Sequence, residues 1–228
     1  MAKSRTYLMI ISLIIFFLLV VSITLLKYHA YFLLSMVILA CIMVPFFIRF
    51  EFRNITGREV VILAILAAIA AVGRVPFAGL PSVQPTSFVI MITGLVFGAE
   101  SGFIVGAVAA IVSNIFLGQG PWTPWQMYAW GMMGMTAGLL RNIDWMNKRW
   151  VLCIFGFVWG YLFGWFMNIW IIVSNMSNIS WEFIVGIYIS SFYHDLAHAL
   201  SNVLFIAIFS VSWIKIINRT KIKYGLFE

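Results

Sequence analysis

Residues 118–130 read GQGPWTPWQMYAW, a segment that follows the apolar run Ser101–Leu117 and leads into a second apolar run, Pro124–Leu140. Pro121 and Pro124 restrict the backbone here, because the proline ring fixes φ. The segment therefore predicts a stiff turn between two membrane-spanning helices. Its indole rings and side-chain amides are the groups that a pocket for a large, flat organic solute needs.

The composition places the chain in a membrane. Of its 228 residues, 64% are hydrophobic and 9% are charged, and the mean hydropathy is +1.06. A soluble domain of this size needs more polar surface, whereas about 20 apolar residues suffice for a helix to cross a bilayer core of about 30 Å. We therefore predict an all-α polytopic membrane protein with almost no soluble domain.

Breaks in the apolar pattern divide the chain into eight candidate spans. They are Tyr7–Leu26, Tyr28–Phe50, Arg58–Val75, Thr86–Gly98, Ser101–Leu117, Pro124–Leu140, Trp150–Ser174 and Trp181–Ile217. The last exceeds the thickness of the bilayer core and is expected to tilt, kink or protrude. No small-x-small cleavage site separates the first two spans, so a retained hairpin, residues 1–57, is expected before a six-helix core, residues 58–228.

The distribution of cations predicts the orientation. With both termini in the cytoplasm, twelve Lys and Arg side chains fall on the inner side and only Lys27 and Arg74 on the outer side, as the positive-inside rule requires. The net charge of +7 then reflects this bias and contact with anionic lipids rather than nucleic-acid binding. The segments Arg74–Pro85, Gly118–Thr123 and Asn175–Ser180 are expected to face outward.

Two of these outward segments are rich in groups that bind ligands. RVPFAGLPSVQP, residues 74–85, contains three prolines, and a preordered loop loses less entropy when it closes over a ligand. The aromatic turn adds Trp122, Trp125, Tyr128 and Trp130 beside Gln119 and Gln126. Each ring alone is also typical of the aromatic belt at a lipid interface. As a group, the rings and amides favour a pocket.

Three stretches of this region resemble a known family. RVPF (74–77), LPSVQPTSFVIMITGLVFGAESGFIVGAVAAIVSN (80–114) and FLGQGPWTPWQMYAWG (116–131) are similar to the substrate-binding S component of energy-coupling factor (ECF) vitamin transporters, most closely the cobalamin-type branch CbrT. The resemblance extends from Arg58 to the C-terminus. It implies a bacterial cell-membrane subunit that captures a vitamin, cobalamin or cobinamide, from outside. It also implies a membrane scaffold subunit and two ATPase subunits as partners.

Two features of the sequence are consistent with such partners. The chain contains no G-x-x-x-x-G-K-[ST] motif, so it is expected to be a transporter subunit without its own ATPase activity, enzymatic function or cofactor. Ala64, Ala68 and Ala71, with Ala67 beside them, are small residues of the kind that let helices approach closely in lipid. We assign all four alanines to a partner-docking surface, and the family resemblance implies that Ala64 and Ala68, an AxxxA pattern, contact the scaffold subunit. An intramolecular helix contact is the alternative.

Glycines at four-residue spacing predict other close helix contacts. Gly156, Gly160 and Gly164 form one such series, and the pairs Gly94/Gly98 and Gly102/Gly106 form two more. We interpret them as packing faces within one subunit rather than as homodimer contacts.

The last span carries HDLAH at residues 194–198. A charge at the bilayer centre costs about 2.5 to 3.5 kcal/mol on insertion scales, so such groups normally face protein or water. The pattern resembles the H-E-x-x-H of zinc proteases, but Asp195 is shorter than Glu and no third ligand is evident, so no metal site is predicted. His194, Asp195 and His198 are assigned either a pocket or conformational role, or a structural hydrogen-bond network.

The predicted substrate site combines these groups with polar residues of other spans. Its members are Arg74, Gln84, Asn114, Gln119, Trp122, Trp125, Gln126, Tyr128, Trp130, Asn168, Tyr188, His194 and Asp195. Their polar groups would bind the amides of cobalamin, and the tryptophans would cover its apolar faces. Three alternatives stay open: an S component for another vitamin, a stand-alone ion-coupled permease that uses Asp195 as its protonatable group, and an intramembrane metalloprotease.

Overall fold

The structure is a computed structural model that describes residues 37, 43–44, 47–48, 55–175 and 179–226. The predicted spans Tyr7–Leu26 and Tyr28–Phe50, and the middle of the predicted turn Asn175–Ser180, lie largely outside the described residues. The assignment of residues 1–57 to a hairpin therefore stays a prediction.

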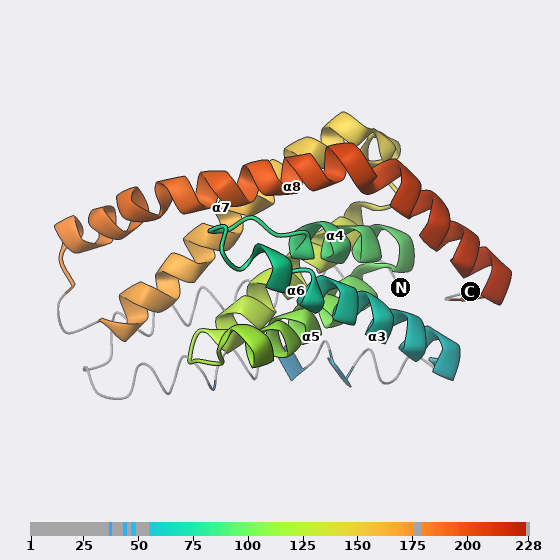
Figure 1. The fold of residues 1–228 in the computed structure, drawn as a ribbon, viewed down its shortest axis with the longest axis horizontal. Coiled ribbons are helices and arrows are strands. Elements are labelled where there is room, and N and C mark those ends of the chain that lie inside the picture. The colour runs from blue at the N-terminus through green and yellow to red at the C-terminus, as the bar shows by residue number, and fades with distance from the viewer. Residues whose placement is uncertain (1–36, 38–42, 45–46, 49–54, 176–178, 227–228) are drawn as a thin grey trace.

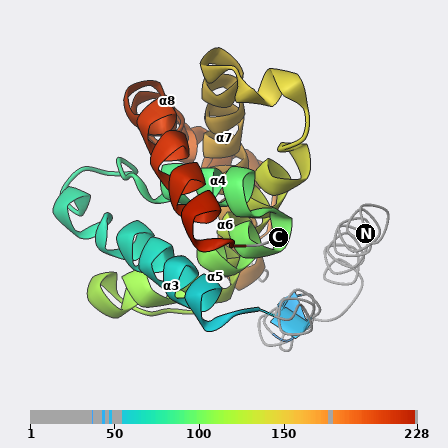
Figure 2. The ribbon, with the colours of Figure 1, turned by 90° about the vertical axis from the view of Figure 1, so that its right-hand side faces the viewer.

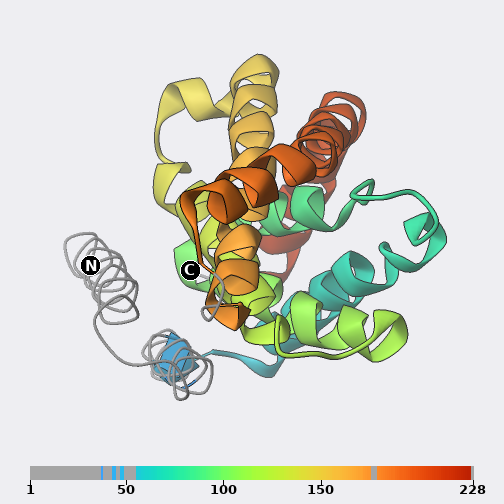
Figure 3. The ribbon, with the colours of Figure 1, turned by 90° about the vertical axis from the view of Figure 1, so that its left-hand side faces the viewer.

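All regular structure in residues 55–175 and 179–226 is helical. The elements are α3 (Gly57–Val72), η1 (Val75–Phe77), α4 (Thr86–Phe97), α5 (Ala99–Leu117), α6 (Thr123–Leu140), η2 (Asp144–Asn147), α7 (Arg149–Ser174) and α8 (Trp181–Tyr224). Figure 1 shows α7 and α8 along one side of the molecule, and Figures 2 and 3 place α4 and α6 between them and the pair α3 and α5. The prediction of an all-α fold with six helices in this part of the chain is confirmed.

Four helical segments are long and apolar enough to cross a membrane: Gly57–Phe77, α5, α7 and α8. α4 is apolar but has only 12 residues, which makes it shorter than a bilayer core is thick. It is also almost completely buried among the other helices. The chain is therefore a multi-pass membrane protein.

Local chemistry explains where two of these helices begin. α3 starts with a capping box, in which the Thr56 hydroxyl accepts from the Glu59 N–H at 3.4 Å and the Glu59 carboxylate accepts from the Thr56 N–H at 2.7 Å. α5 follows α4 after one residue, Gly98, whose φ of +100° lies in a region that residues with a Cβ rarely adopt. The glycine allows the chain to change direction without a longer linker.

α8 extends beyond its predicted end at Ile217 and continues to Tyr224. Its last turn contains Lys221 and Lys223, whose charges interact favourably with the helix dipole, and Gly225 ends the helix in a left-handed conformation. These polar residues end the apolar run but not the helix, which is why hydropathy alone placed the boundary too early. The 44 residues span about 66 Å, and the helix bends in its C-terminal half (Figure 1).

The glycine series lie at helix contacts inside the subunit, as predicted. A Cβ on Gly94 or Gly102 would overlap the backbone of Gly134, so α4, α5 and α6 approach one another at backbone distance. On α7, a Cβ on Gly160 would overlap the backbone of Ala199 of α8. These contacts bring the polar residues of α8 close to α7 and to the centre of the molecule.

Candidate functional site

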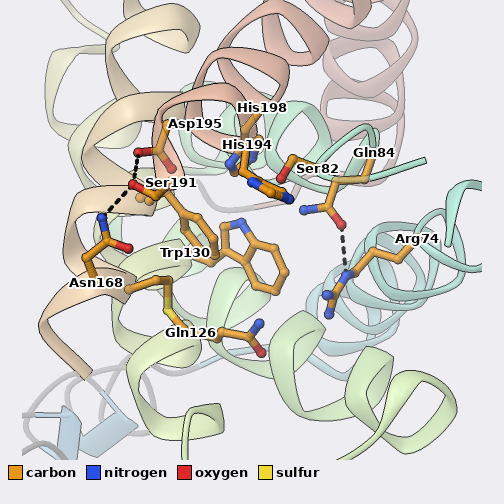
Figure 4. Close-up of a pocket in the computed structure, with 13 residues that line it drawn as sticks. Arg74, Ser82, Gln84, Gln126, Trp130, Asn168, Ser191, His194, Asp195 and His198 are labelled. Atoms are coloured by element: carbon orange, nitrogen blue, oxygen red, sulfur yellow. Dashed lines mark hydrogen bonds between the residues drawn. The ribbon is translucent and has the colours of Figure 1, made fainter. Parts of the chain in front are cut away.

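A cavity of about 290 Å³, called here the central cavity, lies between α6, α7, α8 and the loop that joins α3 to α4. It is lined by Arg74, Ser82, Gln84, Gln126, Trp130, Phe163, Gly164, Met167, Asn168, Ser191, His194, Asp195 and His198. Figure 4 shows Arg74 and Gln84 at one end and Asn168, Ser191 and Asp195 at the other, with Trp130 between them. The cavity is thus polar at both ends and aromatic in the middle.

Arg74 holds its position at one end through neutral partners. Its Nε donates to Oε1 of Gln84 at 2.9 Å, and its Nη1 donates to Oγ of Ser113 at 2.6 Å and to Oδ1 of Asn114 at 3.0 Å. These bonds fix the plane of the guanidinium group. Its positive charge is not neutralised by any of the three acceptors.

Asn114 connects this arginine to the start of α6. The side chain is 2% exposed, and its Nδ2 donates to Oγ1 of Thr123 at 3.0 Å and to Oε1 of Gln126 at 2.7 Å. Both ends of the amide are therefore bonded, as a buried amide requires. Asn114 supports Arg74 and Gln126 without lining the cavity itself.

The α3–α4 loop is also bound to α8. The backbone N–H of Gln84 donates to Oγ of Ser201 at 3.0 Å, and the Ser201 hydroxyl donates to the Gln84 carbonyl at 3.3 Å. Ser82, two residues earlier, is the one residue other than glycine with a positive φ, 61°, among the described residues. The loop therefore follows a defined path over the cavity.

Trp130 forms the aromatic centre of the site. Its ring stacks on Phe163 with a centroid distance of 4.9 Å and an angle of 25°, and it is fully buried. Its Nε1 donates to Oγ of Ser87 at 3.3 Å, and the same hydroxyl lies 2.8 Å from Nε2 of His198. Because an indole N–H only donates, Ser87 accepts from Trp130, and its own hydrogen is available for His198.

The acidic end of the cavity is a chain of hydrogen bonds between α7 and α8. Nδ2 of Asn168 donates to Oγ of Ser191 at 2.8 Å, and that hydroxyl lies 2.9 Å from Oδ2 of Asp195. Gly164 makes room for the carboxylate, since a Cβ there would overlap Oδ1 of Asp195. Asp195 is 4% exposed, so the protein holds a carboxyl group at the depth of the helix bundle.

The structure brings together seven of the thirteen residues predicted for the substrate site. Arg74, Gln84, Gln126, Trp130, Asn168, His194 and Asp195 line the central cavity, and His198 of the HDLAH segment joins them. Gln126 and Trp130 share one face of α6 because they are four residues apart. The loop of residues 74–85 and the aromatic segment of residues 118–130, which were predicted to face each other, thus both line the cavity. The aromatic segment does so through the helix face that carries Gln126 and Trp130.

The other aromatic residues of that segment lie elsewhere. Trp125 and Tyr128 are buried against Phe166 of α7, at centroid distances of 5.5 and 5.3 Å. Trp122 packs near Trp170 at 6.1 Å, and Gln119 is exposed and bonds to the Ile111 carbonyl. Spacing explains the division, because residues 125 and 128 lie on a different face of the helix from residues 126 and 130.

Tyr188 lines a separate groove between α7 and α8, which we call the lateral groove. The groove has a volume of about 520 Å³ and is mainly aromatic and apolar. The Tyr188 hydroxyl donates to the Trp165 carbonyl at 3.5 Å. Of the predicted site residues, Asp195 lines both this groove and the central cavity. Tyr188 therefore does not join the predicted site.

The four alanines of α3 do not form one surface. Ala64 and Ala68 are exposed, whereas Ala67 and Ala71 are buried in the bundle, at 4% and 0% exposure. A partner cannot reach the buried pair in this structure. The docking prediction therefore narrows to Ala64 and Ala68.

Five lining residues were not predicted: Ser82, Phe163, Gly164, Met167 and Ser191. Ser191 had a usable signal, since it lies four residues before Asp195 on the same helical face. Gly164 belongs to a recognised glycine series, but its relation to a carboxylate depends on how α7 and α8 are paired. Within the described parts of the chain, no group of three His, Cys, Asp or Glu side chains is placed to hold a metal ion.

The fold and the site define a helical membrane protein with an internal cavity that is lined mainly by polar residues. A family model described as the substrate-specific component of ECF transporters matches residues 58–222. The chain belongs to this family. Because the match covers the part of the chain from α3 through most of α8, it includes every residue that lines the central cavity.

Curated relatives match a shorter stretch. A UPF0397 protein of Vibrio atlanticus is 33% identical over 91 residues, which cover 38% of this chain and 50% of the relative. The folate transporter FolT of Streptococcus mutans is 28% identical over 107 residues, 44% of this chain and 58% of the relative. The chain thus matches about half the length of these proteins. No solved structure matches it.

Proposed function

We propose that this chain captures a small vitamin-like solute from outside the cell in the central cavity and delivers it inward together with a scaffold subunit and two ATPase subunits. The observation that carries the proposal is the central cavity, which has hydrogen-bonding groups at both ends and a stacked aromatic pair in the middle. Small-molecule sites combine apolar surface with placed polar groups, and the many polar side chains of this cavity suit a polar solute. The chain binds the solute, and its partners supply the energy.

The dimensions of the cavity favour a solute smaller than a corrinoid. Its volume of about 290 Å³ lies just below the range for small-molecule pockets, about 300 to 1,000 Å³. Cobalamin and cobinamide, the ligands expected from the resemblance to CbrT, are macrocycles that need more room. Trp122, Trp125 and Tyr128, which were expected to cover such a ligand, pack against α7 instead. We therefore rank cobalamin below a smaller, flat vitamin.

Folate is one such alternative. The similarity to a folate transporter supports it, and so does the chemistry of folate, which combines a flat heterocycle with carboxylates. The carboxylates would pair with Arg74, and the heterocycle would lie against Trp130. One experiment that compares the binding of folate and cobalamin to the chain therefore distinguishes these two candidates.

The exposed pair Ala64 and Ala68 supports a docking role for α3. Small residues allow another helix to approach closely in lipid. Both side chains are exposed on the surface of the described bundle, where a partner can reach them. We assign the contact with the scaffold subunit to this pair. With both termini in the cytoplasm, the α3–α4 loop and the central cavity would then open to the outside.

Reconstitution tests the proposal directly. The full chain, co-expressed with an ECF scaffold and two ATPases, should co-purify with them and support uptake of radiolabelled folate or cyanocobalamin into proteoliposomes only when ATP is present. ATPases that cannot hydrolyse ATP are the control. Uptake by this chain alone, driven by a proton gradient and lost in Asp195→Asn, would instead identify a stand-alone permease.

A further inference from the structure

The central cavity contains two opposite charges that do not neutralise each other. Among the residues that the structure describes, Arg74 bonds only to the neutral side chains Gln84, Ser113 and Asn114, and Asp195 accepts only from Ser191. Neither makes an ion pair with another described residue. Unpaired charges are costly at membrane depth, where little water solvates them.

Each charged group also has one polar atom that is not used. The Nη2 of Arg74 donates to no described residue, because the three bonds of the guanidinium come from Nε and Nη1. The Oδ1 of Asp195 accepts from no described residue, because Ser191 bonds to Oδ2. The Oδ1 atom lies against the backbone of Gly164, in the room that a Cβ there would take, and the Asp195 residue lines the central cavity. The cavity thus offers an unused donor at one end and an unused acceptor at the other.

The neighbouring histidines do not supply the missing cation for Asp195. Nε2 of His198 lies 2.8 Å from the Ser87 hydroxyl, and this ring packs edge-on against Phe163. His194 is exposed and makes no ion pair with a described carboxylate. His194 is near enough to act on Asp195 electrostatically but forms no ion pair with it, so a bound cationic group would be the first direct ionic partner of this carboxylate.

The groups between the two ends are aromatic and apolar. Trp130 and Phe163 are stacked, and Met167 lines the cavity next to them. Figure 4 shows the indole of Trp130 between Arg74 and Asp195. The Trp130 ring already stacks on Phe163 and lies under the Arg74 guanidinium, so a flat, unsaturated ligand group would contact the edges of these rings, and edge-to-face packing also favours planar partners.

We infer that the central cavity selects a compact zwitterion, with an anionic group at Nη2 of Arg74, a flat centre against Trp130 and a protonated nitrogen at Oδ1 of Asp195. The inference rests on the proposed capture function and specifies the class of its substrate, and it disfavours folate, which carries carboxylates but no protonated nitrogen for Asp195. A ligand of this kind neutralises both charges at once. A ligand with one charge leaves the other charge buried and unpaired.

A matched set of three probes tests the inference with the purified full chain. 4-(Aminomethyl)benzoate carries both charges, 4-methylbenzoate only the negative one and 4-methylbenzylamine only the positive one, and all three share one ring. Isothermal titration should give the zwitterion an affinity about tenfold higher than either single-charge probe, since one charge-assisted hydrogen bond has about that effect.

Variants should remove this preference one end at a time. Asp195→Asn, which keeps the shape of the side chain, should lower the affinity for 4-(aminomethyl)benzoate to that for 4-methylbenzoate and leave 4-methylbenzoate binding unchanged. Arg74→Gln should lower it to that for 4-methylbenzylamine. If Arg74→Gln does not fold, Arg74→Lys, which keeps the charge but has no Nη2, should still weaken binding of 4-(aminomethyl)benzoate and leave 4-methylbenzylamine binding unchanged. Asp144→Asn, at an exposed carboxylate in η2, is the matched control and should change nothing.

The inference is overturned if the zwitterion binds no more tightly than the better single-charge probe, or if none of the three binds in the millimolar range. A different result would reject the proposed function. Absence of ATP-dependent uptake by the assembled complex, with the preference for the zwitterion intact, would reject the transport role alone. Normal uptake without this preference would reject only the substrate class.

Discussion

The guanidinium carbon of Arg74 lies 4.9 Å from the centre of the Trp130 ring. The same ring stacks on Phe163 of α7 and donates its N–H to Ser87 of α4. One side chain of α6 therefore contacts the α3–α4 loop and two further helices. Because the loop carries the cation of the central cavity, Trp130 couples the position of that cation to the packing of the bundle.

Two substitutions of Trp130 should distinguish the contribution of its ring to stability from that of its N–H donor. Trp130→Phe keeps a stacking ring but loses the hydrogen bond to Ser87 and part of the cation–π contact, which should lower stability by about 1 to 2 kcal/mol. Trp130→Ala also leaves a cavity and should cost about 3 to 5 kcal/mol. Unfolding in mixed micelles, followed by circular dichroism, measures both. Trp145→Phe, at a half-exposed position, is the control, and equal losses for Phe and Ala would contradict the separation.

The Asn114 amide should matter more than its size suggests. Asn114→Ala removes one bond to Arg74 and two to α6, and it leaves Oε1 of the half-buried Gln126 without its donor. We expect a loss of about 2 kcal/mol in the free energy of unfolding. Gln119→Ala removes an exposed amide that bonds to the Ile111 carbonyl and to Thr123, and should cost less than about 0.5 kcal/mol. The same micelle titration compares the two variants, and a similar loss for both would show that burial is not the cause.

The helical core could be predicted closely from the sequence. All six long helices start within two residues of the positions expected from the apolar runs, because glycine, proline and polar residues interrupt those runs where the chain turns. The exception is the end of α8, where Lys221 and Lys223 continue the helix beyond the apolar region. The hydropathy of a segment indicates whether it lies in the membrane. It does not indicate where a helix ends, because the backbone hydrogen bonds of a helix continue where the helix leaves the membrane.

The site was harder to predict, because it depends on which face of each helix turns inward. Composition identified the aromatic segment, yet only Gln126 and Trp130 reach the cavity, while Trp125 and Tyr128 face α7. Near the start of a helix, the phase of the helical turn depends on the residue at which the helix begins. The pairing of Gly164 with Asp195 likewise depends on the register between α7 and α8, and no local pattern contains that register.

Gly160 should tolerate no side chain. A Cβ there would overlap the backbone of Ala199, so Gly160→Ala would push α7 away from α8 and should destabilise the protein by about 1 to 3 kcal/mol. Gly186 on α8 has open space around it, and Gly186→Ala should be neutral or stabilise the helix by up to about 1 kcal/mol. Thermal unfolding in detergent compares the two. A loss for Gly186→Ala as large as that for Gly160→Ala would mean that helix contact is not what excludes the methyl group.

The exposed alanines of α3 should affect assembly without affecting the fold. Ala64→Trp or Ala68→Trp places a bulky ring on the surface assigned to the scaffold subunit, so co-purification with the scaffold should be lost, because close helix contacts in lipid need small residues. Thermal stability of the isolated chain should not change, since both positions are exposed. Ser190→Trp, at an exposed position on α8, is the matched control and should leave the complex intact. A complex that survives both alanine substitutions would place the docking surface elsewhere on the subunit.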